Sequence, residues 1–491
     1  MAGEKTAPPA TLVIFGAGGD LTRRLLVPSL IHMMAAGMID DQFSVLGVSR
    51  SEMSDAEFRQ SLEDFDAGET GAGYAKAWRK LRGKVHYMAG DVTDSGFYTQ
   101  LDERLEKDGA DNAVFYLAIS PSLFEPIIDG LGEAGLFEKK GAFRRLAVEK
   151  PFGHNAASAK ALNAKILRWV DENDTYRIDH FLGKETVQNI MVARFANAMI
   201  EAVWNRQYID NVQITVAETV DVGTRGEFFD ATGTLRDMVP NHLFQILAMT
   251  AMEPPNRFDA ASIREAKSQL LDAIRIPNAK DVKRDTVRGV YTAGNVGGNK
   301  VAAYAKADGV ASDSRTETYA ALKLEIDNWR WAGIPFYLRT GKAMSHKDSE
   351  VVVTFKPVPY ADFRDAKVGT IPGNRLVLQL QPDEGISLDF MAKKPGAEIE
   401  PTPVAMQFSY ADYFELGGST GYETLIYDIL TGDQTLFQRA DAVEAAWRIV
   451  DPITKAWKSG KPETYRAGSA GPKAADGLLE RDGRQWHALG R

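Results

Sequence analysis

Short apolar runs and charged stretches follow one another in turn along the first 150 residues. Short, β-branched apolar runs predict buried strands at Thr11–Phe15, Phe43–Val48, Lys84–Met88, Asn112–Ile119 and Leu146–Glu149. Charged stretches with helical spacing lie between them, as at Asp55–Phe65 and Phe97–Lys107. Strands that alternate with helices are typical of a parallel, doubly wound sheet. We therefore expect an N-terminal Rossmann dinucleotide-binding domain, with its ligand contacts at the carboxyl ends of the strands.

The hydrophobic pattern changes after Asn173. Alternating segments predict strands at Asp210–Glu218, Glu317–Ile326, Val351–Phe355, Arg375–Gln381 and Val404–Ser409. Helical patterns cover Val187–Ile200, Asp230–Met252, Glu415–Leu430 and Ala440–Trp457. This order predicts a larger second domain with a mainly antiparallel sheet and helices. We place the domains at residues 1–176 and 177–491, and expect the glycine-rich segment Thr464–Arg491 to lie along the surface.

Composition narrows the class of protein. The chain has 491 residues, of which 44% are hydrophobic and 25% charged, as in ordinary globular proteins. Cysteine is absent, which excludes disulfides and thiolate chemistry and favours a reducing, cytoplasmic location. The net charge of −9 argues against nucleic-acid binding, and no apolar run is long enough for a membrane span. We expect no metal centre.

A glycine turn follows the first predicted strand. The sequence Gly16-Ala17-Gly18-Gly19-Asp20-Leu21 comes just before a helical pattern, although Leu21 occupies the third glycine position of the usual GxGxxG motif. Glycines let the backbone approach a pyrophosphate, whose charge suits a helix N-terminus. Candidate cofactor-binding residues are therefore Gly16, Gly18, Gly19, Asp20 and Leu21. An ordinary strand–turn–helix is the alternative, and Pro28 predicts a kink or an early end of the helix.

Two cations follow other predicted strands. Arg50 comes just after the second strand, where an acidic residue would favour NAD and an arginine can hold the 2′-phosphate of NADP. Lys150 precedes Pro151, which restricts the lysine to extended geometry at a strand end. Arg50 and Lys150 are both candidate cofactor-binding residues, although each could instead be an ordinary surface charge. We favour NADP as cofactor and leave NAD possible.

The stretch Arg177–Glu185 reads RIDHFLGKE. His180 and Lys184 are four residues apart, so a helix or tight turn would put both on one face, where they suit a phosphate. Asp179 points elsewhere and suits orienting a catalytic histidine. A solvated polar loop is the alternative.

These motifs, with several more, resemble the glucose-6-phosphate dehydrogenase family. The matching stretches run in order along nearly the whole chain: GAGGDLTRR at 16–24, EKPFG at 149–153, RIDHFLGKE at 177–185, LRDMVPNHL at 235–243, RTGKAM at 339–344, GDQTLFQRADAVEAAWRIVDPI at 432–453, AGSAGP at 467–472 and DGRQW at 482–486. The resemblance implies oxidation of glucose 6-phosphate at C1, with hydride transfer to NADP, in a homodimer or homotetramer formed through the large sheet.

The resemblance also implies roles for individual residues. His242 would be the general base and Asp179 its partner, while His180 and Lys184 would hold the 6-phosphate with Lys347 near it. The positions that hold sugar hydroxyls correspond to Lys150, Glu218, Asp237 and Lys342, with Gln381 a weaker candidate.

Four residues depart from the family pattern. Leu25 stands where a lysine is common, Phe181 replaces a tyrosine, Pro240 replaces a glutamine, and Gly18 replaces a serine or threonine. The changes at Leu25, Phe181 and Pro240 motivate one alternative, a catalytically weak sensor that binds sugar phosphate and NADP. Another Rossmann-type sugar oxidoreductase sharing Glu-Lys-Pro is the second alternative.

Overall fold

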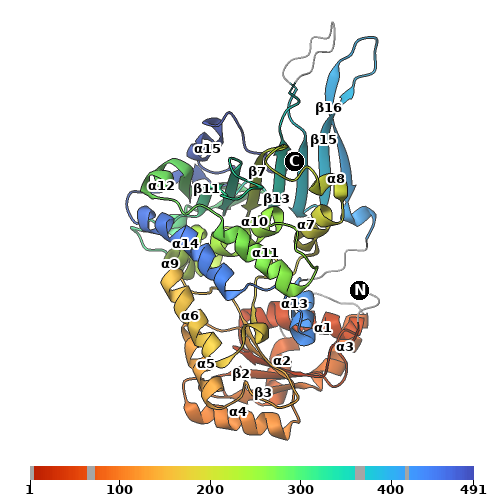
Figure 1. Cartoon of the computed structure of the whole chain (residues 1–491). Coiled ribbons are helices and arrows are strands. Elements are labelled where there is room, and N and C mark those ends of the chain that lie inside the picture. The colour runs from red at the N-terminus through yellow and green to blue at the C-terminus, as the bar shows by residue number, and fades with distance from the viewer. Residues whose placement is uncertain (1–4, 64–71, 360–370, 415–419, 491) are drawn as a thin grey trace. The chain divides into compact units, whose positions relative to one another are not determined.

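The computed structural model describes residues 5–63, 72–359, 371–414 and 420–490 (Figure 1). The chain divides into two compact units. The first unit comprises Met1–Glu185, Pro255–Glu265 and Gly417–Glu444. The second comprises Thr186–Pro254, Ala266–Leu416 and Ala445–Arg491.

The first unit contains a six-stranded sheet in the order β3-β2-β1-β4-β5-β6. Every neighbouring pair is parallel. This strand order is that of a doubly wound dinucleotide-binding fold, so the Rossmann prediction is confirmed. The strands are β1 (Thr11–Phe15), β2 (Ser44–Ser49), β3 (Val85–Ala89), β4 (Ala113–Leu117), β5 (Arg144–Val148) and β6 (Thr175–Arg177).

Helices cover both faces of this parallel sheet. The strand order proceeds outward from β1 to β3 on one side of the sheet's centre and from β4 to β6 on the other side. Right-handed crossovers therefore put the helices of the two halves on opposite faces. Accordingly, α1 contacts α3 and α13, whereas α5 contacts α4 and α6 (Figure 1). The helices are α1 (Val27–Ala36), α2 (Asp55–Glu63), α3 (Ala72–Arg82), α4 (Ser95–Lys107), α5 (Phe124–Glu133), α6 (Ala156–Trp169) and α13 (Tyr422–Thr431), with short turns η1 (Thr22–Leu26), η2 (Pro121–Leu123) and η3 (Glu172–Asp174).

Two helices of this unit differ from the sequence predictions. The helix does not end at Pro28, because a π-helical turn, η1, precedes it and the proline lies in the first turn of α1. The backbone stays helical from η1 into α1, so the π-helical turn accommodates the proline within a continuing helix. The predicted helix Glu415–Leu430 begins outside the described residues, and α13 covers Tyr422–Thr431.

The second unit is built on a nine-stranded sheet in the order β16-β15-β14-β13-β7-β12-β11-β8-β17. Among the described residues, only β7–β12 and β8–β17 pair in parallel, so the sheet is mainly antiparallel, as predicted. Its strands are β7 (Ile209–Ala217), β8 (Thr286–Thr292), β11 (Tyr319–Glu325), β12 (Pro335–Gly341), β13 (Asp348–Phe355), β14 (Arg375–Gln381), β15 (Gly385–Lys393), β16 (Pro401–Ser409) and β17 (Glu463–Arg466). A separate hairpin pairs β9 (Gly294–Val296) with β10 (Asn299–Val301).

The predicted helix Asp230–Met252 is interrupted twice. It consists of α9 (Gly226–Met238), a π-helical turn η5 (Val239–Leu243) and α10 (Phe244–Ala251). Gly233 has a φ of 74° and breaks α9, and Pro240 lies in the first turn of η5. Other helices are α8 (Ala198–Glu201), α12 (Ala279–Asp285), α15 (Gly477–Glu480), η4 (Gly223–Arg225), η6 (Tyr304–Lys306), η7 (Tyr410–Asp412) and η8 (Lys473–Ala475), while α7 (Glu185–Phe195), α11 (Ala260–Asp272) and α14 (Ala440–Trp457) have residues in both units.

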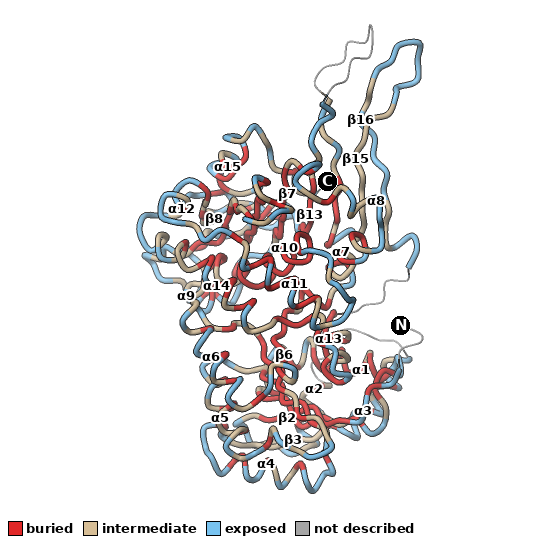
Figure 2. Tube along the Cα trace, in the orientation of Figure 1, coloured by how far each residue is buried: buried red, intermediate tan, exposed pale blue. Residues whose placement is uncertain are grey.

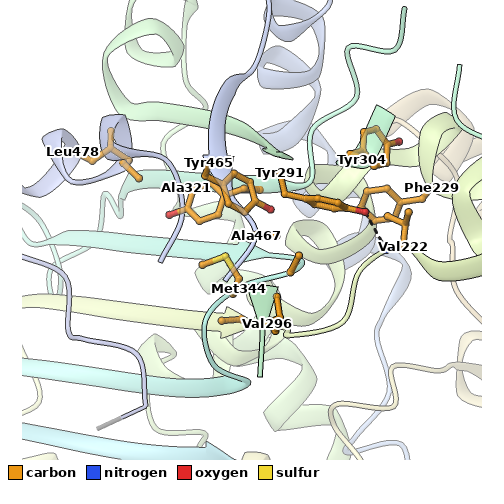
Figure 3. Packing of buried hydrophobic residues seen from close by; sticks show 14 of the residues in the cluster. Val222, Phe229, Tyr291, Val296, Tyr304, Ala321, Met344, Tyr465, Ala467 and Leu478 are labelled. Carbon is orange, nitrogen blue, oxygen red and sulfur yellow. Dashed lines mark hydrogen bonds between the residues drawn. The ribbon is translucent and has the colours of Figure 1, made fainter. Parts of the chain in front are cut away.

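An aromatic core lies at one end of the large sheet (Figure 3). Tyr291, Tyr304 and Tyr465 pack with Phe229 and Met344, and the Tyr291 hydroxyl accepts from the Val222 N–H at 3.4 Å. The expectation that Thr464–Arg491 lies along the surface is wrong in part. This segment supplies most of the edge strand β17, and its members Tyr465, Ala467, Ala475, Leu478 and Leu479 are buried in this core.

Burial is uneven along the large sheet (Figure 2). Every residue of β12 is buried, whereas no residue of β15 or β16 is. Val404 and Met406 of β16 are exposed apolar residues. None of the helices among the described residues combines the length and the apolar character needed to cross a bilayer.

Candidate active site

The glycine turn lies at the carboxyl end of β1. Gly16 has a φ of 90°, and a Cβ built on it would come within 2.3 Å of the Ala118 carbonyl oxygen, so only glycine fits. Gly18 faces open space apart from the Ser49 hydroxyl, which a Cβ would meet at 3.8 Å. Gly19 and Asp20 are exposed, and Leu21 is half-buried. This turn leaves backbone accessible to a pyrophosphate, so the residues present fit a dinucleotide.

Arg50 follows β2 directly and is exposed. Its predecessor Ser49 is the residue whose side chain faces Gly18, which puts the end of β2 beside the glycine turn. The pKa of the Asp91 carboxyl, beyond β3, is lowered chiefly by hydrogen bonds from Thr93. The positive charge of Arg50 lowers it further. An exposed guanidinium beside this turn has the chemistry to hold a ribose phosphate.

Lys150 and Glu149 follow β5. Lys150 is half-buried, and its peptide bond to Pro151 is cis. Glu149 is buried, and its carboxylate accepts from the hydroxyls of Tyr116 at 2.6 Å and Tyr422 at 3.2 Å. Burial raises the pKa of Glu149 to about 7, although both hydroxyls and the Lys150 charge act against the rise. The sequence analysis did not select Glu149, and its only signal was its place beside Lys150.

A tight turn after β6 gathers three of the predicted residues. Asp179 is 1% exposed and accepts the Phe181 N–H at 3.0 Å. The Lys184 ammonium lies 3.7 Å from the centroid of the Phe181 ring, and the His180 ring lies edge-on to the same ring at 5.2 Å. His180 and Lys184 therefore both contact the Phe181 ring, and their sharing one face of the turn stays a prediction.

Two predicted sugar-binding residues form an ion pair in the second unit. Glu218 follows β7 and Lys342 follows β12, and these strands are parallel neighbours with Ala217 opposite Gly341. The Lys342 ammonium donates to the Glu218 carboxylate at 2.6 Å. Lys342 is buried, and Glu218 is about one-third exposed at 33%. Their strand ends emerge from the aromatic core, which contains Ala217, Ala343 and Met344.

His242 and Asp237 lie on the interrupted helix of the second unit. His242 is 1% exposed and lies in the π-helical turn η5. Asp237 is half-buried near the end of α9, and its carbonyl accepts the Asn241 amide at 3.1 Å. The helix is held at its break by Glu317, whose carboxylate accepts the Leu235 N–H at 3.0 Å.

Lys347 and Gln381 lie elsewhere in this unit. Lys347 is exposed and lines a groove of 790 Å³ together with Asp348, Gln379 and Asp383. The described lining of that groove does not include Glu218, Asp237, His242 or Lys342. Gln381 is half-buried at the end of β14. A second groove of 620 Å³ on the same sheet lies against Asp389 and Arg484 and contains none of the predicted site residues among the described lining.

The predicted residues are shared between the units. Lys150, Asp179, His180 and Lys184 belong to the first, and the remaining predicted sugar and catalytic residues belong to the second. A parallel sheet with an open glycine turn is the architecture of nicotinamide-dinucleotide-dependent oxidoreductases.

Comparisons with known proteins identify the family. The model described as "Glucose-6-phosphate dehydrogenase, NAD binding domain" matches residues 13–189, and that described as "Glucose-6-phosphate dehydrogenase, C-terminal domain" matches residues 191–487. The chain belongs to the glucose-6-phosphate dehydrogenase family and is an oxidoreductase. It is 44% identical to glucose-6-phosphate 1-dehydrogenase of Aggregatibacter actinomycetemcomitans, over 97% of this chain and 96% of that protein.

Two solved structures are similar over their full lengths. The glucose-6-phosphate 1-dehydrogenase of Mycobacterium avium is 37% identical with a TM-score of 0.85, covering 98% of this chain and 99% of that one. A glucose-6-phosphate dehydrogenase in complex with its substrate glucose-6-phosphate is 31% identical with a TM-score of 0.88, covering 99% and 100%. These full-length matches decide against the shorter sugar oxidoreductases that share only the Glu-Lys-Pro element.

Proposed function

We propose that the protein oxidises D-glucose 6-phosphate at C1 to 6-phospho-D-glucono-1,5-lactone, the first step of the oxidative pentose phosphate pathway. The observation that carries the proposal is the turn after β6, where His180 and Lys184 flank the Phe181 ring. Two basic side chains that meet at one aromatic ring suit a phosphate monoester. The family membership supports the same substrate.

The reaction needs a base and a hydride acceptor. NADP⁺, when bound, supplies the acceptor for the hydride from C1. His242 takes the proton of the C1 hydroxyl, because an alcohol becomes a good hydride donor only as its proton leaves. The Asp179 carboxylate orients His242 and stabilises the imidazolium that forms.

The remaining residues bind and orient the sugar. His180 and Lys184 hold the 6-phosphate with Lys347 near it. Hydroxyl groups are held by Lys150, Glu218, Asp237 and Lys342, with Gln381 a weaker candidate. The Lys342–Glu218 ion pair supports this part of the proposal, because a buried ammonium paired with a partly exposed carboxylate presents a donor and an acceptor from neighbouring strand ends.

We propose NADP⁺ as the preferred cofactor and leave NAD⁺ use possible. Arg50 beside the glycine turn supports NADP⁺, since a guanidinium can pair with a 2′-phosphate. We place dinucleotide binding in residues 1–176 and sugar binding in residues 177–491, and the family-model boundary at residues 189–191 supports a division near this point.

The test is the steady-state rate of nicotinamide reduction with glucose 6-phosphate. NADP⁺ and NAD⁺ are compared side by side, with unphosphorylated glucose as the control. We expect turnover that requires the phosphate and prefers NADP⁺. Turnover that prefers NAD⁺ would keep the reaction and reject the role of Arg50. Binding of sugar phosphate without turnover would establish the sensor alternative, with Leu25, Phe181 and Pro240 as the first residues to revert.

A further inference from the structure

A buried carboxylate joins three elements of the first unit. Glu149 after β5 accepts from Tyr116 on β4 and from Tyr422 in the first turn of α13, both through its oxygen Oε1. Tyr116 is fully buried and Tyr422 is 3% exposed. In sequence, Tyr422 lies 273 residues from Glu149, so this contact exists only in the folded protein.

The hydroxyls in this cluster stay protonated. Burial chiefly raises the pKa of Tyr116 and of Tyr422, and the nearby Glu149 carboxylate adds to both effects. Both tyrosines therefore donate to Glu149 at neutral pH. A carboxyl group inside a protein is costly unless hydrogen bonds satisfy it, and an apolar side chain would fill the same space at lower cost. This cost indicates that the cluster has a role besides packing.

The Tyr422 ring connects the cluster to the substrate turn. It stacks on His180 with an interplanar angle of 8° and a centroid separation of 6.5 Å. Phe181 contacts the same imidazole edge-on, with an interplanar angle of 61°. His180 is therefore held between two aromatic rings, and the one on α13 is anchored by its hydroxyl. Rings at such separations attract one another and restrict tilting.

We propose that Tyr422 is a positioning residue that sets the orientation of His180 toward the substrate phosphate, with Glu149 as its anchor. The inference rests on the proposed function, in which His180 binds that phosphate. Neither Tyr422 nor Glu149 needs to touch the substrate. The anchor matters because a charge-assisted hydrogen bond to phosphate depends on the direction of the imidazole N–H. A loose Tyr422 ring would let His180 tilt.

Tyr422→Phe tests the proposal, because it removes one oxygen and keeps the ring. We expect the KM for glucose 6-phosphate to rise about three- to tenfold, a range typical of one lost hydrogen bond, with kcat within about twofold of wild type. The inhibition constant of inorganic phosphate, competing with the sugar phosphate, should rise by the same factor. The KM for NADP⁺ should not change.

Tyr304→Phe is the matched control. Tyr304 is a buried tyrosine of the second unit whose hydroxyl donates to the Asp230 carboxylate at 2.8 Å. Its loss should lower the Tm without changing the KM for glucose 6-phosphate or the phosphate inhibition constant. If Tyr422→Phe behaves like this control, with a lower Tm and unchanged phosphate binding, the positioning role is overturned.

A second pair of variants tests the anchor independently. Glu149→Gln keeps an oxygen that accepts from both tyrosines and should leave the KM within about twofold of wild type, whereas Glu149→Leu removes the acceptor and should raise it like Tyr422→Phe. Equal KM values in these two variants would overturn the anchor, including where Tyr422→Phe does not fold.

His180→Asn separates this inference from the proposed function. If His180→Asn leaves both the KM and phosphate inhibition unchanged, His180 does not bind the phosphate, and that part of the proposed function fails. If His180→Asn weakens phosphate binding while Tyr422→Phe does not, only the positioning role of Tyr422 fails.

Discussion

His242 shows how much a single residue depends on its surroundings. By sequence it is one histidine in an apolar helical pattern, and in the structure it is 1% exposed in a π-helical turn. Such turns are rare inside helices and are found frequently at functional sites, because they redirect a side chain relative to a regular helix. Burial also excludes bulk water from the imidazole, which suits a proton acceptor.

Replacing this histidine should separate chemistry from binding. We expect His242→Asn to lower kcat by about 10² to 10⁴, the usual contribution of a general base, and to retain glucose 6-phosphate binding. The measurements are steady-state kcat and a dissociation constant from calorimetric titration. Turnover close to wild type would reject His242 as the base.

Arg50 should decide between the two nicotinamide cofactors. We expect Arg50→Ala to lower kcat/KM for NADP⁺ by about 10- to 150-fold, which corresponds to a charged hydrogen bond of about 1.5–3 kcal/mol. The same ratio for NAD⁺ should stay nearly constant, since NAD⁺ has no 2′-phosphate. Exposed Arg82 on α3, paired with Glu63 at 3.2 Å, is the control. Equal losses with both cofactors would contradict the assignment.

Glu149 should make stability depend on pH in an unusual direction. Its pKa is raised by burial from 4.5 to about 7, so the native state keeps a proton that the unfolded chain has lost between these values. The contribution of this proton to the free energy of unfolding is fully present below about pH 4.5. It is lost as the pH rises through about 7, and the loss is at most about 3 kcal/mol. The groups that act on Glu149 are Tyr116, Tyr422, Lys150 and Asp179.

Urea unfolding of wild type and Glu149→Gln at pH 5 and pH 8 measures this effect. Glutamine does not titrate, so wild type should lose stability relative to the variant between the two pH values. An identical pH dependence for both proteins would show that Glu149 does not hold its proton at pH 5.

At the scale of elements, the helix made of α9, η5 and α10 shows most clearly how the structure departs from the predicted elements. The sequence predicted one helix over Asp230–Met252, and the structure has a π-helical turn at Pro240. The break at Gly233 was not predicted. A Cβ on this glycine would come within 2.5 Å of the Glu317 carboxylate, and Glu317 comes from a distant part of the chain.

The fit of Pro240 in η5 gives a prediction about stability. Pro240 lies in η5, which continues α9 as helical backbone, so its ring removes an intrahelical N–H donor. The Asn241 side-chain amide donates to the Arg236 and Asp237 carbonyls at 3.5 and 3.1 Å, which offsets that loss, and the ring restricts the unfolded chain. We expect Pro240→Ala to lower the free energy of unfolding by about 0.4–1 kcal/mol, measured by urea denaturation. A more stable variant would mean that the ring strains this turn and that the family's glutamine is the better residue.

At the scale of the whole molecule, the outer strands β15 and β16 of the large sheet are unusually exposed. No residue of β15 or β16 is buried, and Met406 is 56% exposed. β15 pairs with β14 only over Gly385–Asp389, so its outer half forms a two-stranded ribbon with β16. An isolated two-stranded ribbon is marginally stable in water, and apolar residues exposed on it favour a partner. A second copy of the chain is the partner that the family resemblance implies, so we propose a homodimer or homotetramer formed through this sheet.

Met406→Glu should shift the protein toward monomers, because a charge in an apolar interface is costly unless it is paired. Sedimentation velocity over a range of concentrations measures the shift. Met199→Glu on α8, where the methionine is 79% exposed, is the matched control and should leave the oligomer intact. A wild-type protein that sediments as a stable monomer would reject the oligomer.

The sequence by itself determined the two kinds of sheet, the glycine turn, and the local turn that carries His180 and Lys184. These features rest on local periodicity and short spacings, which each segment carries within itself. Tertiary structure decided the rest. The Lys342–Glu218 pair, the burial of the C-terminal segment and the stacking of Tyr422 on His180 join residues far apart in the chain. Such contacts depend on which strand ends and helices become neighbours in the fold. The pattern of a single segment does not specify its neighbours.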